Sequence, residues 1–106
     1  MSLKGDLFAK TVVLDERARE TLDYVCENWE GGELAWLVIE WVLSRDRLAG
    51  RRIPEVERAE LRAFQYYGAR SIKQPDLYVF YEVLENEIVV KVIAYDEAQA
   101  ASAGHA

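Results

Sequence analysis

The pattern of apolar and polar positions begins with a segment suited to a half-buried sheet. Leu7–Leu14 (LFAKTVVL) is rich in β-branched, aromatic and aliphatic side chains, which pack well on a pleated surface, and we predict a first strand there. Asp15 follows directly, and a carboxylate at such a position accepts hydrogen bonds from the free backbone N–H groups that open a helix. A helix is therefore expected to begin after Asp15.

The next segment has the spacing of an amphipathic helix. Apolar residues recur at intervals of four, three, one and three positions, which places them on one side of a helix: Ala18, Leu22, Val25, Cys26 and Trp29. Because Cys26 belongs to this stripe, we expect it in the core. Gly31 and Gly32 then predict the end of this helix and the sharp reversal of a helical hairpin.

A second helix is predicted from Glu33 to Ala49, with Gly50 as a left-handed C-terminal cap. Its core stripe is predicted to contain Leu34, Leu37, Val38, Trp41 and Leu48. Three more residues, Trp36, Ile39 and Leu43, widen the apolar arc beyond one side of the helix. Either the sheet and the first helix together cover this arc, or one of these three residues is exposed on the isolated chain. A partner protein, or a second copy in a homodimer formed through this helix, would cover it.

The second half of the chain is predicted to be mainly strands. Arg51–Glu60 is a polar connection, and Leu61–Tyr67 favours a strand over a last helical turn. Leu77–Leu84 and Glu87–Tyr95 are rich in Val, Ile, Tyr and Phe and predict a hairpin at the centre of an antiparallel sheet.

The hairpin prediction fixes which side chains meet the helices. Asn86 lies in the short connection, and Asn tolerates the positive φ that a two-residue hairpin demands. Strict alternation places Ile88, Val90 and Val92 on the side covered by the helical hairpin.

This order of elements predicts an α+β fold in two layers: an N-terminal strand, a helical hairpin and a three-strand antiparallel meander. The length of 106 residues corresponds to about one domain. We assign a single domain to residues 7–97, a flexible N-terminus to residues 1–6 and a disordered, small-residue-rich tail to residues 98–106.

The residue inventory excludes several kinds of chemistry. One cysteine rules out an intramolecular disulfide and any CxxC metal or redox site, and the one histidine, His105, stands beside the end of the chain. The glycine spacing matches no phosphate-binding loop. We expect neither a metal nor a cofactor. The longest apolar stretch, Leu34–Leu43, is far shorter than the ~20 residues that span a bilayer. We expect a cytoplasmic protein without a membrane partner.

Charge is segregated along the chain. The net charge is −6, which by itself disfavours nucleic acid as a partner. However, residues 45–73 contain eight basic and four acidic residues, a net charge of +4, whereas the remainder contains five basic and fifteen acidic residues. A phosphate-binding face in this segment and an ordinary surface with helix-face ion pairs are both compatible with that pattern.

Element order and local sequence together resemble the RelE/ParE toxin superfamily. Trp41–Gly50 (WVLSRDRLAG) is similar to the end of helix two in that family. Val79–Val83 (VFYEV), followed by Glu87–Val92 (EIVVKV), resembles its closing hairpin. The resemblance covers Leu7–Asp96 and implies the toxin component of a type II toxin–antitoxin system, with the cognate antitoxin as partner.

The resemblance also implies candidate site residues. One branch of the family contains metal-independent endoribonucleases that cut mRNA on the ribosome, where cations offset charge on the scissile phosphate and other groups move protons. Its implied catalytic residues here are Arg62, Arg70 and Tyr81, and its implied RNA- or phosphate-binding residues are Arg51, Arg52, Lys73 and Tyr66. We expect the five basic residues of this set to converge on one face, with Tyr66 or Tyr81 among them.

Three hypotheses on function stay open at this point. The first is a RelE-like ribonuclease, the second a non-catalytic ParE-like protein that contacts DNA gyrase or another target, and the third a regulatory homologue that binds only its antitoxin or its own copy. After the last strand, where the ribonucleases have Arg, His or Tyr, this chain has Tyr95 followed by Asp96 and Glu97. These carboxylates repel phosphate and favour protein contact, whereas the basic segment favours the ribonuclease.

Overall fold

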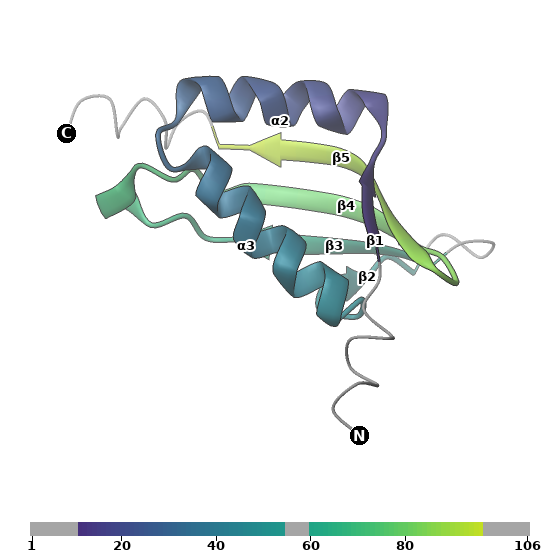
Figure 1. The fold of residues 1–106 in the computed structure, drawn as a ribbon. Helices are drawn as coiled ribbons and strands as arrows, with labels where there is room; N and C mark the ends of the chain where they lie inside the picture. The colour runs from purple at the N-terminus through teal and green to yellow at the C-terminus, as the bar shows by residue number, and fades with distance from the viewer. Residues whose placement is uncertain (1–10, 55–59, 97–106) are drawn as a thin grey trace.

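The structure, a computed structural model, describes residues 11–54 and 60–96 (Figure 1). Its elements in chain order are β1 (Thr11–Leu14), α2 (Glu16–Asn28), α3 (Gly32–Arg45), β2 (Arg51–Arg52), β3 (Glu60–Tyr66), the 3-10 helix η1 (Arg70–Ile72), β4 (Leu77–Val83) and β5 (Glu87–Tyr95). The predicted α+β class is confirmed. The tails predicted at residues 1–6 and 98–106 lie outside the described residues.

The strands form one mixed sheet in the order β1-β5-β4-β3-β2. β1 pairs in parallel with β5, and the other neighbouring strands pair antiparallel. Arg51 and Arg52, expected in a connection, form the short edge strand β2 because they pair with Ala63 and Arg62 of β3. Both helices lie over one face of the sheet (Figure 1), and the core fills the space between them.

Helix α2 begins as predicted. The Asp15 carboxylate accepts a hydrogen bond of 2.9 Å from the backbone N–H of Ala18. Ala18, Leu22 and Val25 are buried against the sheet, but Cys26 is exposed. The expectation that Cys26 belongs to the core is wrong, because it stands one residue beyond Val25 and so lies about 100° further round the helix.

The set of β5 residues that faces the helices shifts by one position within the strand. Ile88 and Val90 are buried as predicted, but Val92 is exposed and Ile93 takes its place in the core. The pairing shifts between Phe80 and Tyr81, which face Val92 and Val90 respectively, so β5 holds one extra residue. Such a bulge reverses the alternation of side chains beyond it.

Two backbone predictions are wrong. Among the described residues other than glycine, Lys73 alone has a positive φ, so Asn86 does not adopt the conformation expected of it. The backbone N–H of Leu84 still closes the hairpin on the Glu87 carbonyl at 2.9 Å. Helix α3 ends at Arg45 rather than Ala49, and Gly50 has no positive φ.

Gly50 is required for a different reason from the one expected. A Cβ atom at Gly50 would lie 2.8 Å from both the Ala63 carbonyl oxygen and the Tyr81 hydroxyl. The backbone passes too close to β3 and β4 for any side chain, and this close approach positions the contacts described next.

Candidate functional site

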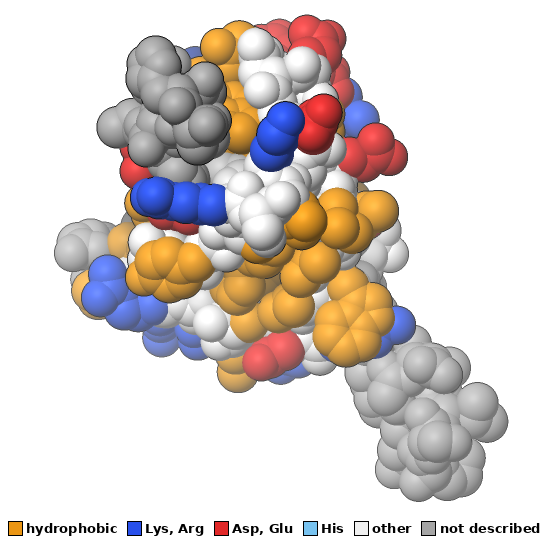
Figure 2. Space-filling view, turned by 90° about the vertical axis from the view of Figure 1, so that its left-hand side faces the viewer, with side chains coloured by type: hydrophobic (Ala, Val, Ile, Leu, Met, Phe, Trp, Pro, Cys, Tyr) orange, Lys and Arg blue, Asp and Glu red, His pale blue; other side chains and the backbone are white. Residues whose placement is uncertain are grey.

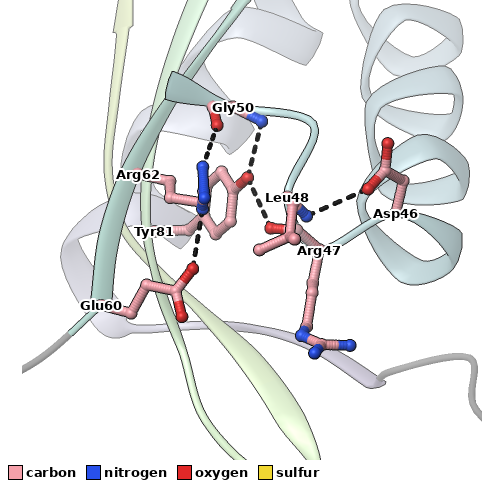
Figure 3. Close-up of polar contacts among 7 residues, drawn as sticks. All are labelled: Asp46, Arg47, Leu48, Gly50, Glu60, Arg62 and Tyr81. Carbon is pink, nitrogen blue, oxygen red and sulfur yellow. Dashed lines mark hydrogen bonds and ion pairs between the residues drawn. The ribbon is translucent and has the colours of Figure 1, made fainter. Parts of the chain in front are cut away.

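Tyr81 anchors the connection between α3 and β2 (Figure 3). Its ring is fully buried, and its hydroxyl donates to the Arg47 carbonyl and accepts from the Gly50 N–H, both at 2.9 Å. Burial is the main cause that raises the pKa of Tyr81 above the value of 10 ordinary for tyrosine. The hydroxyl is thus a neutral internal donor and acceptor. This burial contradicts the expected position of Tyr81 beside a substrate, because Tyr81 alternates with Leu77 and Val79 on the helix-facing side of β4.

Arg62 takes part in the same network rather than facing solvent. Its Nη1 donates to the Gly50 carbonyl at 2.6 Å, and its Nε pairs with Glu60 Oε2 at 2.9 Å (Figure 3). The Arg62 side chain is 15% exposed. Two of its five N–H donors are used in these contacts, and its low exposure and the neighbouring Glu60 carboxylate disfavour a phosphate at the remaining ones.

The two arginines of β2 point to opposite faces of the sheet. Arg52 is paired with Arg62 and so shares the side of the helices, whereas Arg51 is paired with Ala63 and shares the open side. Both are exposed. Alternation along a strand therefore separates them.

The remaining predicted residues lie at the other end of β3 or beyond it. The Tyr66 hydroxyl donates to Gln74 Oε1 at 2.8 Å, and the Lys73 ammonium lies 3.4 Å from Glu30. Arg70 is exposed in η1. Tyr66 is four residues along the strand from Arg62, or about 13 Å at the usual rise.

The predicted convergence of five basic residues is therefore wrong. Arg51 and Arg52 occupy opposite faces, Arg62 is held by Glu60, and Arg70 and Lys73 follow the far end of β3. Tyr95 packs inward as well, because its ring stacks on Tyr24 at 5.5 Å and meets Trp29 edge-on at 5.3 Å. Glu55, Glu57 and Arg58 lie outside the described residues.

The sequence pattern predicted the wrong side of α3 to be exposed. Trp36, Ile39 and Leu43, one of which was expected to be exposed, are all buried. Of the residues predicted as its core stripe, Leu48 is 49% exposed beyond the end of α3, and the four within the helix also face solvent: Leu34 is 50% exposed, Leu37 51%, Val38 39% and Trp41 58%. We call these four residues the α3 face.

Close packing between the two helices sets this orientation. A Cβ atom at Gly32 would lie 2.9 Å from the Val25 carbonyl oxygen, so only glycine allows the approach. Ala35, one turn further on, is fully buried. Small residues at these positions fix the inner side of α3, and Trp36, Ile39 and Leu43 follow them at helical spacing. The pair Gly32 and Ala35 was the sequence signal for the correct orientation.

The α3 face lies within a continuous apolar surface. Figure 2 shows a band of hydrophobic side chains on the side of the molecule that carries α3, with charged side chains around it. The Arg45 guanidinium stacks 4.5 Å above the Trp41 ring at one end of the helix. Contiguous apolar surface of this kind marks sites where proteins meet other proteins.

An open groove runs beside the α3 face along the edge strand β1. One part is lined by Val12, Leu37, Glu40, Trp41, Ser44 and Arg45. The adjoining part, toward α2, is lined among others by Val12, Leu37, Asp23, Glu33 and Glu40. Three carboxylates against the single arginine of that part, Arg19, give it an acidic character.

Other kinds of site find no support in the described part of the chain. Residues 11–54 and 60–96 contain no group of three or more His, Cys, Asp or Glu side chains placed to hold a metal ion. Within the same ranges, no helix is both long and apolar enough to cross a membrane.

No protein-family model matches the chain, and no curated protein matches it either.

Proposed function

We propose that this chain is the toxin component of a type II toxin–antitoxin module, with a RelE/ParE-like two-layer fold, and that it acts by protein contact rather than by cutting RNA. The observation that carries the proposal is the α3 face, four large apolar side chains exposed at helical spacing. Burying such a surface against a partner is strongly favourable, since each Å² of apolar area removed from water contributes about 25 cal/mol.

The arrangement of the basic residues supports contact over cleavage. A ribonuclease needs cations and proton-transfer groups around one phosphate. Here the Tyr81 hydroxyl is bound by the backbone, and the Arg62 guanidinium is bound by Glu60 and by the Gly50 carbonyl. Of the three residues implied as catalytic in the ribonuclease branch, Tyr81 and Arg62 are thus engaged inside the protein, and exposed Arg70 lies away from both.

Charge beside the α3 face indicates the nature of the partner. Asp23, Glu33 and Glu40 line the groove along β1, and apolar residues such as Leu37 form its floor and wall. A segment that presents apolar side chains to α3 and basic side chains to the groove is complementary to this surface. We propose that the cognate antitoxin supplies such a segment, and that the cellular target uses the same surface.

Induced expression in a bacterial host tests the proposal. We expect the wild-type chain to arrest growth while cellular mRNA stays intact on northern blots. Leu37→Glu with Trp41→Glu should restore growth, because two carboxylates disrupt the α3 face. Tyr67→Glu is the matched control, since Tyr67 is an aromatic residue outside this surface and is even more exposed than Trp41.

Two results would overturn the proposal. Cleaved mRNA on induction, lost in an Arg70→Glu, Lys73→Glu variant, would restore the ribonuclease hypothesis. Undiminished growth with the wild-type chain well expressed would remove the toxin function.

A further inference from the structure

The α3 face has the spacing of a helix–helix seam. Leu34, Leu37, Val38 and Trp41 follow one another at three, four and seven positions from the first, so they form one stripe along the outer side of the helix. Stripes of this spacing pack against a second helix with the same pattern. We propose that a second copy of this chain covers the α3 face, in a two-fold dimer with the two α3 helices antiparallel.

The register follows from the order of residues along the stripe. An axis passing between Leu37 and Val38 places Leu34 of each copy opposite Trp41 of the other, and Leu37 opposite Val38. The Trp41 side chain of each copy, the largest of the stripe, then packs against Leu34 at one end of the other copy's stripe. A two-fold axis uses the same patch on both copies, so one self-complementary helix is sufficient.

Charges at the ends of α3 fit the same register. Counting outward from the axis, Arg45 at the end of the helix falls opposite Glu30 just before its start. Glu30 is exposed and holds Lys73 at 3.4 Å, so its carboxylate can also receive a guanidinium at that site. Arg45 already stacks on Trp41, which directs its charge along the stripe. Antiparallel packing also sets the positive end of each helix dipole beside the negative end of the other.

The size of the surface agrees with a weak to moderate dimer. Four large side chains, each about half exposed, present on the order of 350 Å² of apolar area, within the range of functional patches. With Leu48 and Arg45 added, the patch is still smaller than the roughly 800 Å² per partner of a standard interface, so the dimer belongs with the weak, transient interfaces. Area alone does not set affinity, and we expect a dissociation constant of micromolar or weaker.

The dimer uses the same α3 face as the proposed function, and to that extent rests on it. It adds a way to regulate the binding of other partners to this face. A second copy and a heterologous partner compete for Leu37 and Trp41. The dimer therefore shields the apolar surface until a partner that binds more tightly, such as the antitoxin segment proposed above, displaces one copy.

Sedimentation velocity of the purified full-length chain, from about 1 to 300 μM, tests the dimer. We expect a concentration-dependent shift from monomer to dimer. Trp41→Glu should raise the dissociation constant by about 30-fold or more, because it removes the largest side chain of the seam and sets a carboxylate against apolar residues. Tyr67→Glu, the exposed aromatic control, should leave it unchanged. Circular dichroism and thermal melts establish that each variant is folded, which the exposure of both residues favours.

A charge swap tests the register. Arg45→Glu alone should weaken the dimer, because it sets a carboxylate opposite Glu30, and Glu30→Arg alone should do the same. The double variant should regain the wild-type dissociation constant. A double variant no better than either single one would overturn the antiparallel arrangement.

Monomer at every concentration would overturn the dimer and leave a different protein as the occupant. A dimer that survives Trp41→Glu unchanged would overturn the role of the α3 face. Failure of the dimer and failure of the proposed function are distinguishable. If the chain sediments as a monomer but its expression still arrests growth through Leu37 and Trp41, only the dimer is contradicted. If it sediments as a dimer but its expression has no effect on growth, only the proposed function is contradicted.

Discussion

Replacement of Tyr81 by phenylalanine removes one oxygen atom from the interior and tests what holds the α3–β2 connection in place. The ring stays, so the apolar packing of this fully buried side chain is unchanged. The lost contacts are the two hydrogen bonds of 2.9 Å to Gly50 and Arg47. Each is worth about 1 kcal/mol net, and a buried N–H left without a partner, here that of Gly50, costs about 1 to 3 kcal/mol. We expect a loss of about 2 to 3 kcal/mol in unfolding free energy.

Urea denaturation followed by circular dichroism measures this loss directly. In a thermal melt, Tyr81→Phe should unfold about 10 °C or more below the wild type. Tyr78→Phe is the matched control, because Tyr78 lies on the same strand but on the opposite face of the sheet, where its side chain is only half-buried. It should change stability by less than about 0.5 kcal/mol. A loss below about 1 kcal/mol for Tyr81→Phe would refute the role of its hydroxyl.

The same substitution has a signature in pH. Burial raises the pKa of Tyr81 above its ordinary value of 10 in the folded state, so the folded protein favours the neutral phenol. The stabilisation is fully present below pH 10 and is lost as the pH rises through the raised pKa. The difference in stability between wild type and Tyr81→Phe should therefore shrink above pH 10. A difference that is constant up to pH 11.5 would contradict the burial of this hydroxyl.

Two further predictions concern the helices. At protein concentrations low enough to keep the chain monomeric, Trp36→Ala should lower the free energy of unfolding by about 3 to 5 kcal/mol and Trp41→Ala by under about 1 kcal/mol, because only Trp36 is buried. Chemical denaturation of both variants measures these losses. Equal losses would contradict the orientation of α3. The thiol of Cys26 should react more slowly with iodoacetamide at pH 8 than free cysteine, since burial, Glu33 and Asp23, in that order, raise its pKa above 9.0. Glu33→Gln should accelerate this reaction, and an unchanged rate would remove the electrostatic cause.

Local sequence was sufficient where each prediction depended on neighbouring residues. The Asp15 cap formed because a carboxylate at that position can reach the N–H of Ala18 without help from the rest of the fold. Leu77–Val83 and Glu87–Tyr95 became strands because their β-branched and aromatic side chains favour an extended backbone.

The candidate surface depended on distant contacts. Helix α3 is apolar on nearly every side, so its periodicity allowed two orientations. The choice was made by the approach of Gly32 to the Val25 carbonyl on another helix, a contact between residues that hydropathy does not rank. The basic residues were likewise separated by strand alternation at β2 and by the ion pair of Arg62 with Glu60.

The sequence by itself determined the α+β class, the start of α2 and the central hairpin, because capping, hydropathy and backbone preference act over a few neighbouring residues. Only the tertiary structure decided the exposed side of α3, the bulge that turns Val92 outward and the burial of Tyr81. Each of these depends on pairing or close approach between segments far apart in the chain. There the free energy of packing exceeds the small local preferences that a sequence pattern records.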